Sequence, residues 1–306
     1  MLSIERRIVL AAALGLGLSG CTRPDPWAGI SDARFAELEG HRARGLAALD
    51  RGRSGAPEAV REFQAIRRLA PRLALGHLNC AVAFLLGGSP GEAQGAARDA
   101  LELMPSMALP RMVMARAMEA TVINQLGEHV GPRRFSKDRT PFWVTGLEKV
   151  DEAATLGFEY ASRGEPNNPR ALAMYMDRLA RLGVKDIEKR LYPRRRRLAQ
   201  LAPNDPAARF AWFTSLVERD HYPEALVELD RALATLPKPE AVQGPALTRL
   251  RASLQAGHPD AERNLVAFQQ VLQAQPEYVR AVRALFGDTA HPEDLALREW
   301  DVKRLE

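Results

Sequence analysis

The chain has 306 residues, 46% of them hydrophobic, and a formal net charge of +5. A hydrophobic content of this size is sufficient for a continuous core and excludes a globally disordered chain. The 43 lysine and arginine residues are interleaved with 38 acidic residues, which indicates a surface of mixed charge and not the basic stripe of a nucleic-acid-binding protein. We therefore expect no nucleic-acid partner.

The first 20 residues have the layout of a secretory signal peptide. Arg6 and Arg7 precede an apolar run over Ile8–Leu18, and small residues follow before Cys21. This run is too short to span a bilayer as a helix, whereas a basic segment followed by a short apolar segment is typical of a signal sequence. We therefore predict that residues 1–20 direct export and are then removed.

The end of this segment, Leu18–Cys21, reads LSGC and resembles the lipobox of bacterial lipoproteins. The resemblance implies that the Cys21 thiol is acylated, that cleavage occurs before it, and that the acyl chains anchor the mature chain, with residues 21–31 as a tether. Thr22 stands where an aspartate is associated with inner-membrane retention, so the resemblance implies the periplasmic side of an outer membrane. An ordinary signal peptide, cut near Gly20, is the alternative.

Prolines recur at a fixed spacing through the rest of the chain. Pro71 and Pro105 are 34 residues apart, as are Pro203 and Pro237. Small or apolar residues recur 12, 8 and 5 residues before several prolines of this series: Ala93, Ala97 and Ala100; Ala154, Phe158 and Ala161; Ala225, Leu229 and Ala232. A period near 34 with this pattern predicts a helix–turn–helix array, so we expect an all-α solenoid over residues 32–286.

The unit from Ala74 to Pro105 shows the pattern best. Cys80, Ala81 and Phe84 fall on its first helix, and small residues fall on its second. This order of small and aromatic residues before a proline resembles the tetratricopeptide repeat (TPR) family. The resemblance implies antiparallel helix pairs stacked into a superhelix, with the first helix of each pair lining a concave face that binds segments of other proteins.

Carried onto this sequence, the resemblance places a partner groove on the first helices of successive pairs. The groove would combine apolar anchors with a few charges, which suits the binding of protein segments. Its predicted residues are Leu75, Leu78, Asn79, Val82, Met112, Arg116, Met174, Asp177, Arg181, Phe210, Thr214 and Arg251.

The array is interrupted at about residues 127–145. This polar, basic stretch contains Arg133 and Arg134 and ends in Phe142 and Trp143. A basic loop with two aromatic residues inside a regular array is a candidate partner-specific loop. An insertion whose aromatic residues fold back onto the solenoid is an alternative of equal weight.

Four consecutive arginines, Arg194, Arg195, Arg196 and Arg197, form the strongest cluster of charge. Such a cluster can bind lipid phosphates, lipopolysaccharide or an acidic partner. The interpretation that we favour is a solvated helix that begins after Pro193 and has acidic residues nearby in space.

Beyond the last repeat, Tyr278–Phe286 is predicted to be a helix that caps the open end of the array. Residues 287–306 are rich in charge and are predicted to form a tail.

The sequence contains no arrangement typical of a catalytic or metal site. Its six histidines are scattered, and none has a second ligand at helical spacing. The methionines at 104, 107, 112, 114 and 118 are dense enough for a soft copper site, but the repeat frame makes them core or groove residues. We expect no enzyme activity, no cofactor, no metal and no small-molecule substrate.

Together these features predict a lipid-anchored, periplasmic, TPR-like lipoprotein that acts as a protein–protein interaction scaffold in cell-envelope assembly. Lipoproteins of similar design assist pilus secretin assembly, outer-membrane protein insertion and control of peptidoglycan hydrolases. Its expected partners are envelope proteins. The alternative is a lipid- or polysaccharide-binding envelope protein that uses Arg194–Arg197.

Overall fold

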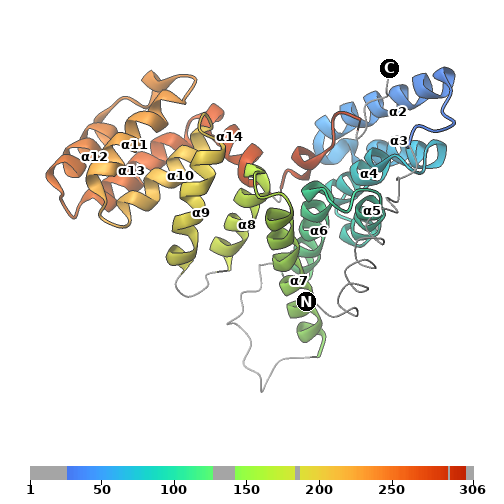
Figure 1. The fold of residues 1–306 in the computed structure, drawn as a ribbon, viewed down its shortest axis with the longest axis horizontal. Helices are drawn as coiled ribbons and strands as arrows, with labels where there is room; N and C mark the ends of the chain where they lie inside the picture. The colour runs from blue at the N-terminus through green and yellow to red at the C-terminus, as the bar shows by residue number, and fades with distance from the viewer. Residues whose placement is uncertain (1–25, 127–141, 183–186, 289, 301–306) are drawn as a thin grey trace, which may run out of the picture.

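A computed structural model of the chain describes residues 26–126, 142–182, 187–288 and 290–300. In these residues, successive helices form antiparallel pairs that stack into an elongated array (Figure 1). The pairs are α2 (Asp32–Asp50) with α3 (Ala56–Leu69), α4 (Ala74–Leu86) with α5 (Pro90–Leu103), α6 (Ala108–Leu126) with α7 (Phe142–Gly164), α8 (Pro169–Arg181) with α9 (Ile187–Leu201), α10 (Pro206–Val217) with α11 (Tyr222–Ala234), and α12 (Pro245–Ala256) with α13 (Ala261–Gln273).

Each second helix also packs on the first helix of the next pair, so neighbours in sequence are neighbours in space throughout the array. A single helix, α14 (Pro276–Phe286), follows the last pair. Three short 3₁₀ helices, η1 (Gly52–Gly55), η2 (Pro239–Val242) and η3 (Pro292–Leu295), lie in the connections and near the C-terminus. The prediction of an all-α solenoid of antiparallel helix pairs is confirmed.

Many helices begin where the sequence supplies the required chemistry. The side chains of Ser31, Asn168 and Asp205 accept hydrogen bonds from the first free backbone N–H groups of α2, α8 and α10. A proline occupies the first position of α5, α8, α10, α12 and α14, where its missing N–H costs no helical hydrogen bond. Most prolines of the repeat series lie instead in the turn after the second helix of a pair, where a helix has just ended: Pro71, Pro105, Pro166, Pro203 and Pro237.

The repeat frame is confirmed by burial. All nine residues that recur 12, 8 and 5 positions before Pro105, Pro166 and Pro237 have no exposed surface. Two glycines show why small residues are needed: a Cβ on Gly45 would lie 2.7 Å from the ring of Phe63, and one on Gly76 would lie 2.9 Å from Ile66. Helices α2 and α4 can therefore approach α3 closely only because these positions lack a side chain.

The core is divided at α10. One apolar cluster runs from Trp27 to Ala208 and includes Leu285 and Leu295 from the C-terminal region. A second cluster, centred on α10 to α13, extends from Phe210 to Leu272. The C-terminal residues in the first cluster show that the chain's end returns to the first repeats. None of the described helices is long and apolar enough to cross a membrane.

The interruption between α6 and α7 is shorter than predicted. The insertion was placed at about residues 127–145, but α7 begins at Phe142, which places Phe142 and Trp143 in its first turn. Arg133 and Arg134 lie outside the described residues, as do the side chains of the two aromatic residues. Cys21 and residues 1–25 also lie outside them.

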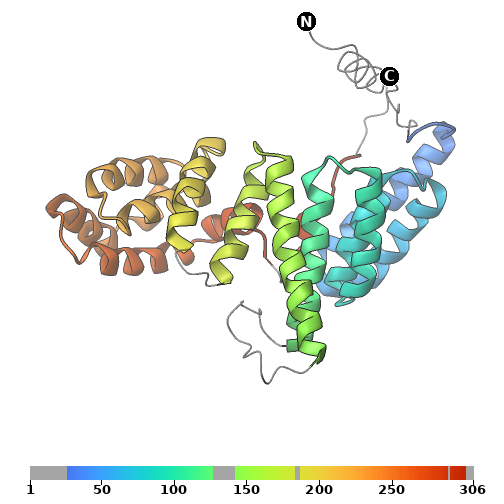
Figure 2. The same cartoon turned by 60° about the horizontal axis from the view of Figure 1, so that its bottom comes forward.

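The C-terminal region differs from the expected cap and free tail. Helix α14 packs across α8 and α10, in addition to α13, and η3 packs on α4 (Figures 1 and 2). The physical reason is the burial of apolar side chains. Leu285 of α14 is 6% exposed, Leu295 of η3 is 2% exposed, and Pro292 of η3 is also buried. Helix α14 starts at Pro276, two residues earlier than predicted, and covers α8 and α10, while η3 covers α4.

Candidate functional site

The candidate site is the concave face formed by α4, α6, α8 and α10, together with the C-terminal residues that cover it. Helix α14 lies over α8 and α10, where the ring of Tyr278 meets Phe210 edge to face at 5.5 Å. The residues after it run from Phe286 towards α4 and α2 (Figure 1). We call residues 290–300 the C-terminal strap.

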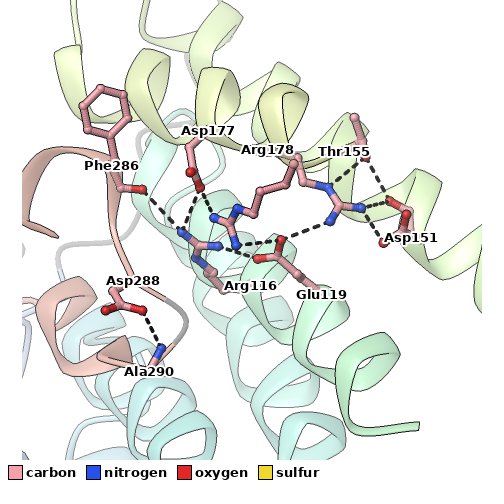
Figure 3. A network of polar contacts seen from close by, with 10 residues as sticks. Arg116, Glu119, Asp151, Thr155, Asp177, Arg178, Phe286, Asp288 and Ala290 are labelled. Atoms are coloured by element: carbon pink, nitrogen blue, oxygen red, sulfur yellow. Dashed lines mark hydrogen bonds and ion pairs between the residues drawn. The ribbon is translucent and has the colours of Figure 1, made fainter. Parts of the chain in front are cut away.

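A network of buried ion pairs lies under this cover (Figure 3). Arg178 of α8 has no exposed surface and contacts carboxylates from two other helices. It donates to Glu119 Oε1 of α6 at 3.0 Å, to Asp151 Oδ1 of α7, and to the hydroxyl of Thr155 at 3.2 Å. Glu119 is equally buried, so these charges are satisfied by one another and hold three helices in register.

The same network reaches the end of α14. Arg116 pairs with Glu119 and donates to the backbone carbonyl of Phe286 at 3.3 Å. Asp177 lies 3.9 Å from Arg116 and also pairs with Arg181. Burial lowers the pKa of the Arg181 guanidinium, and the neighbouring Glu119 opposes this shift. The carbonyl of Phe286 at the end of α14 is thus tied to the buried charges of α6, which are in turn paired with those of α8.

The C-terminal strap is held through its main chain by Asn79. The fully buried side chain of Asn79 donates from Nδ2 to the carbonyl of Leu297 at 2.8 Å. Its Oδ1 accepts from the N–H of the same residue at 2.7 Å. One amide side chain therefore satisfies both backbone groups of a residue that has no regular secondary structure. Such a contact binds the main chain whatever the side chain of the bound residue is.

The strap ends in an aromatic cluster at the start of the array. Trp300 packs against Trp27 at 5.2 Å between ring centroids and against Phe35 at 6.0 Å. Its indole Nε1 donates to Glu39 Oε1 at 2.5 Å, and the guanidinium of Arg42 lies 5.6 Å from its ring. Trp300 therefore has an apolar seat and an acceptor for its one polar atom, the combination a half-buried indole requires.

Charged pairs fix the remaining strap residues. Arg298 binds Asp50 at 2.7 Å, and about half of each side chain is exposed. Asp294 binds Arg283 of α14 at 2.7 Å. Burial lowers the pKa of the neighbouring Arg170, and the charge of Asp294 opposes this shift.

Most predicted groove residues are therefore not open to solvent. Eight of the twelve are buried: Leu75, Leu78, Asn79, Val82, Met112, Arg116, Met174 and Phe210. Asp177, Arg181, Thr214 and Arg251 are partly exposed. The expectation of an open groove along the whole array is corrected: this chain covers the first part of the face with its own C-terminal residues.

Two of the partly exposed groove residues have partners on the later helices. Thr214 accepts from Gln269 of α13 at 3.2 Å, and Arg251 of α12 binds Asp230 of α11 at 2.5 Å. A small cavity of about 220 Å³ lies where α8, α9, α10 and α14 meet, between Asp177 and Phe210. The predicted groove residues thus lie in two places. Those on α4, α6, α8 and α10 lie on the face that α14 and the strap cover, and Arg251 lies apart from them on α12.

The four arginines do not form one basic patch. Arg195 binds Glu218 at 2.9 Å and Ser215 at 2.7 Å, and Arg194 lies 5.5 Å from the ring of Tyr175. Arg197 donates to Asn167 at 2.8 Å. Consecutive positions on a helix point to different sides, which separates the four charges.

The predicted start of this helix after Pro193 was wrong. Helix α9 runs through the proline from Ile187, and Leu191, Leu198 and Ala199 bury one of its sides. Packing of this side overrides the loss of one helical hydrogen bond. Arg196 is exposed and lines a cavity of about 770 Å³ between α9, α10 and α11, whose wall includes Tyr192 and Trp212.

Other candidate chemistry can be placed briefly. No group of three or more histidine, cysteine, aspartate or glutamate side chains able to hold a metal occurs in the described residues. Cys80 is buried, and this burial raises the pKa of its thiol, although Arg67 lies nearby. Met112 is buried and Met114 and Met118 are half-buried in α6, as expected for residues that fill gaps between helices.

Four residues of the site are not predicted from the sequence: Trp27, Trp300, Glu119 and Arg178. Trp27 and Trp300 lie in the segments that were interpreted as tether and tail. Their size could have indicated that these segments pack on the array, because a large aromatic ring is costly to leave exposed in a polar segment. No comparable signal marks Arg178, because a charged residue on a helix is most often solvated.

No protein-family profile matches the sequence, and no curated protein is significantly similar to it. Among solved structures, the chain is similar to YrrB, described as a TPR protein with an unusual peptide-binding site. The two share 19% identity with a TM-score of 0.42, over 72% of this chain and 96% of YrrB. The helix-pair solenoid is established by the packing of this chain's own helices.

Proposed function

We propose that this chain is a non-catalytic scaffold whose concave face binds segments of other proteins. The observation that carries the proposal is the pair of hydrogen bonds between Asn79 and the main chain of Leu297. A buried amide that binds both backbone groups of an extended residue is a means of recognising polypeptide as such. The remaining contacts of the strap add apolar and charged anchors to this main-chain contact.

We further propose that the scaffold is an envelope lipoprotein. The support is in the sequence: a basic and then apolar leader, followed by the LSGC motif ending at Cys21. Acyl chains on Cys21 would anchor the chain on the periplasmic side of the outer membrane, and its partners would be envelope proteins. Membrane fractionation tests the anchor: the Cys21→Ser variant should leave the membrane fraction, and a variant that stays there argues against lipidation.

Crosslinking in cells tests the binding function. A photo-reactive residue at Thr248, which is exposed on the first helix of the α12–α13 pair and outside the part that α14 and the strap cover, should crosslink to a defined set of envelope proteins. The matched control is the same residue at Val266 of α13, which is 55% exposed. Equal recovery of the same proteins from both positions, or of none from Thr248, contradicts the proposal.

A second candidate function follows from the cavity beside Arg196. Its aromatic wall of Tyr192 and Trp212 and its exposed guanidinium suit a saccharide or lipid headgroup that carries negative charge. Retention on anionic vesicles or on an acidic polysaccharide should then fall with salt and be lost in Arg196→Ser. Equal retention of the variant argues against this cavity as the site.

A further inference from the structure

The C-terminal strap is attached to the array in the way that a bound peptide is attached. Its only regular structure is the four-residue η3, and the remaining residues, Ala296–Trp300, have extended or irregular backbone. Its contacts are discrete: Leu295 is buried, Asn79 binds the backbone at Leu297, Arg298 pairs with Asp50, and Trp300 fills the aromatic seat. Each contact joins a strap side chain or backbone group to a helix that is already paired with its neighbours.

These contacts differ in strength. The pair between Arg298 and Asp50 is about half exposed on both sides, and exposed ion pairs contribute little to stability. The aromatic seat and the Asn79 contact are better protected from water, so they are the anchors. A segment fastened at a few anchors can be replaced by another segment that offers the same groups at the same spacing.

We propose that the strap is a resident and exchangeable ligand of this chain's own concave face. The partner that takes its place is a protein segment with a leucine and, five residues later, a tryptophan, as in Leu295 and Trp300, and with free backbone groups between them for Asn79 to bind. This proposal rests on the proposed protein-binding function and names the partner's chemistry. The strap also regulates binding, because a partner must displace a segment that is present at high local concentration.

The cost of displacement follows from the tether. Only a few residues separate Phe286, whose carbonyl is held by Arg116, from the strap. A ligand on a short linker has an effective concentration in the mM range, so a free peptide of equal affinity competes only near that concentration. Weakening the strap should therefore open the site to much lower peptide concentrations.

The test uses the full chain and a labelled peptide with the sequence of residues 290–300. The wild-type chain should not bind the peptide at tens of μM. The Trp300→Ala chain should bind it at least roughly thirtyfold more tightly in apparent Kd, since tryptophan is a typical anchor residue. There are two controls. A peptide with alanine in place of its tryptophan should bind neither chain. A chain with Trp212→Ala, which changes a tryptophan outside the strap's site, should show the same weak peptide binding as the wild-type chain.

Cleavage provides a second measurement if Trp300→Ala disturbs folding. A protease site introduced between Gly287 and Ala290 should allow the strap to be cut in the folded chain. The cut strap should then exchange with labelled peptide on dilution while the helices melt as before. A strap that stays bound through dilution, or helices that lose cooperative melting on cleavage, would show a permanent structural element and overturn the proposal. Crosslinking from Thr248 tests the binding function separately, because that position lies outside the strap's site.

Discussion

The side chain of Asn79 forms two hydrogen bonds with the backbone of Leu297, a residue 218 positions further along the chain. Through these bonds the second helix pair of the array is joined to the C-terminal strap, and the strap in turn reaches the first pair. The array is thus held together in two ways: by packing between consecutive helices and by a segment that crosses several of them. Four predictions separate these contributions.

Replacement of Asn79 by alanine should release the end of the strap. The backbone groups of Leu297 lose their protein partners, and a lost buried hydrogen bond costs about 1–3 kcal/mol. Amide exchange at residues 295–300 should become faster, while exchange in α10–α13 should not change. The control is Asn264→Ala, because the Asn264 side chain is partly exposed and makes one long bond of 3.5 Å to the carbonyl of Arg249. Equal effects of both variants on the strap contradict the role of Asn79.

Replacement of Arg178 by methionine should destabilise the centre of the array. Glu119 and Asp151 would keep buried charges with fewer partners, and breaking a buried ion pair costs about 3–5 kcal/mol. Urea unfolding measures this loss. Arg163→Met is the control, because its pair with Glu159 leaves 72% of the arginine exposed and such pairs contribute about 0–1 kcal/mol. A similar loss in the two variants would mean that the network does not hold α6, α7 and α8 together.

Two neighbouring positions on α11 test the repeat frame. Leu229 has no exposed surface, whereas Val227 is 52% exposed. Leu229→Ala should lower the free energy of unfolding by about 2–5 kcal/mol because it leaves a cavity in the second core cluster. Val227→Ala should change the same quantity by no more than about 0.5 kcal/mol. The reverse order of the two values would show that the register of this repeat is wrong.

The cover formed by α14 should weaken at high pH. Burial, with a smaller contribution from Asp205, raises the pKa of Tyr278 to about 12. In the unfolded chain a tyrosine ionises near pH 10, so between about pH 10 and 12 the folded chain binds more protons at this site and its stability falls as pH rises. The stability that this group contributes is fully present below pH 10.

Comparison with Tyr278→Phe measures this contribution. Two pKa units correspond to about 2–3 kcal/mol, which sets the upper bound on the difference in pH dependence between the chains above pH 10. Tyr160→Phe, which removes a 55% exposed phenol, should keep the wild-type dependence. An identical pH profile for wild type and Tyr278→Phe would contradict the burial of this phenol between α14 and α10.

The sequence alone determined the repeat. Proline at helix starts and turns, and alanine or a large apolar residue at fixed positions, specify contacts between helices that are close in sequence, so their period is visible in the chain. The buried set Ala225, Leu229 and Ala232 was predicted in this way. The leader and lipobox are equally local signals, and what they imply for Cys21 stays a prediction.

Only the tertiary structure decided what covers the concave face. Trp27 and Trp300 lie at opposite ends of the chain in segments without periodicity, and no local pattern links residues so far apart. The same holds for Arg178 and Glu119, whose burial depends on three helices meeting at one point. The packing of a helical repeat can be predicted from its sequence because each unit contacts only its neighbours, which are close in the chain. The position of a segment that returns across the array depends instead on the shape and charge of residues from several units.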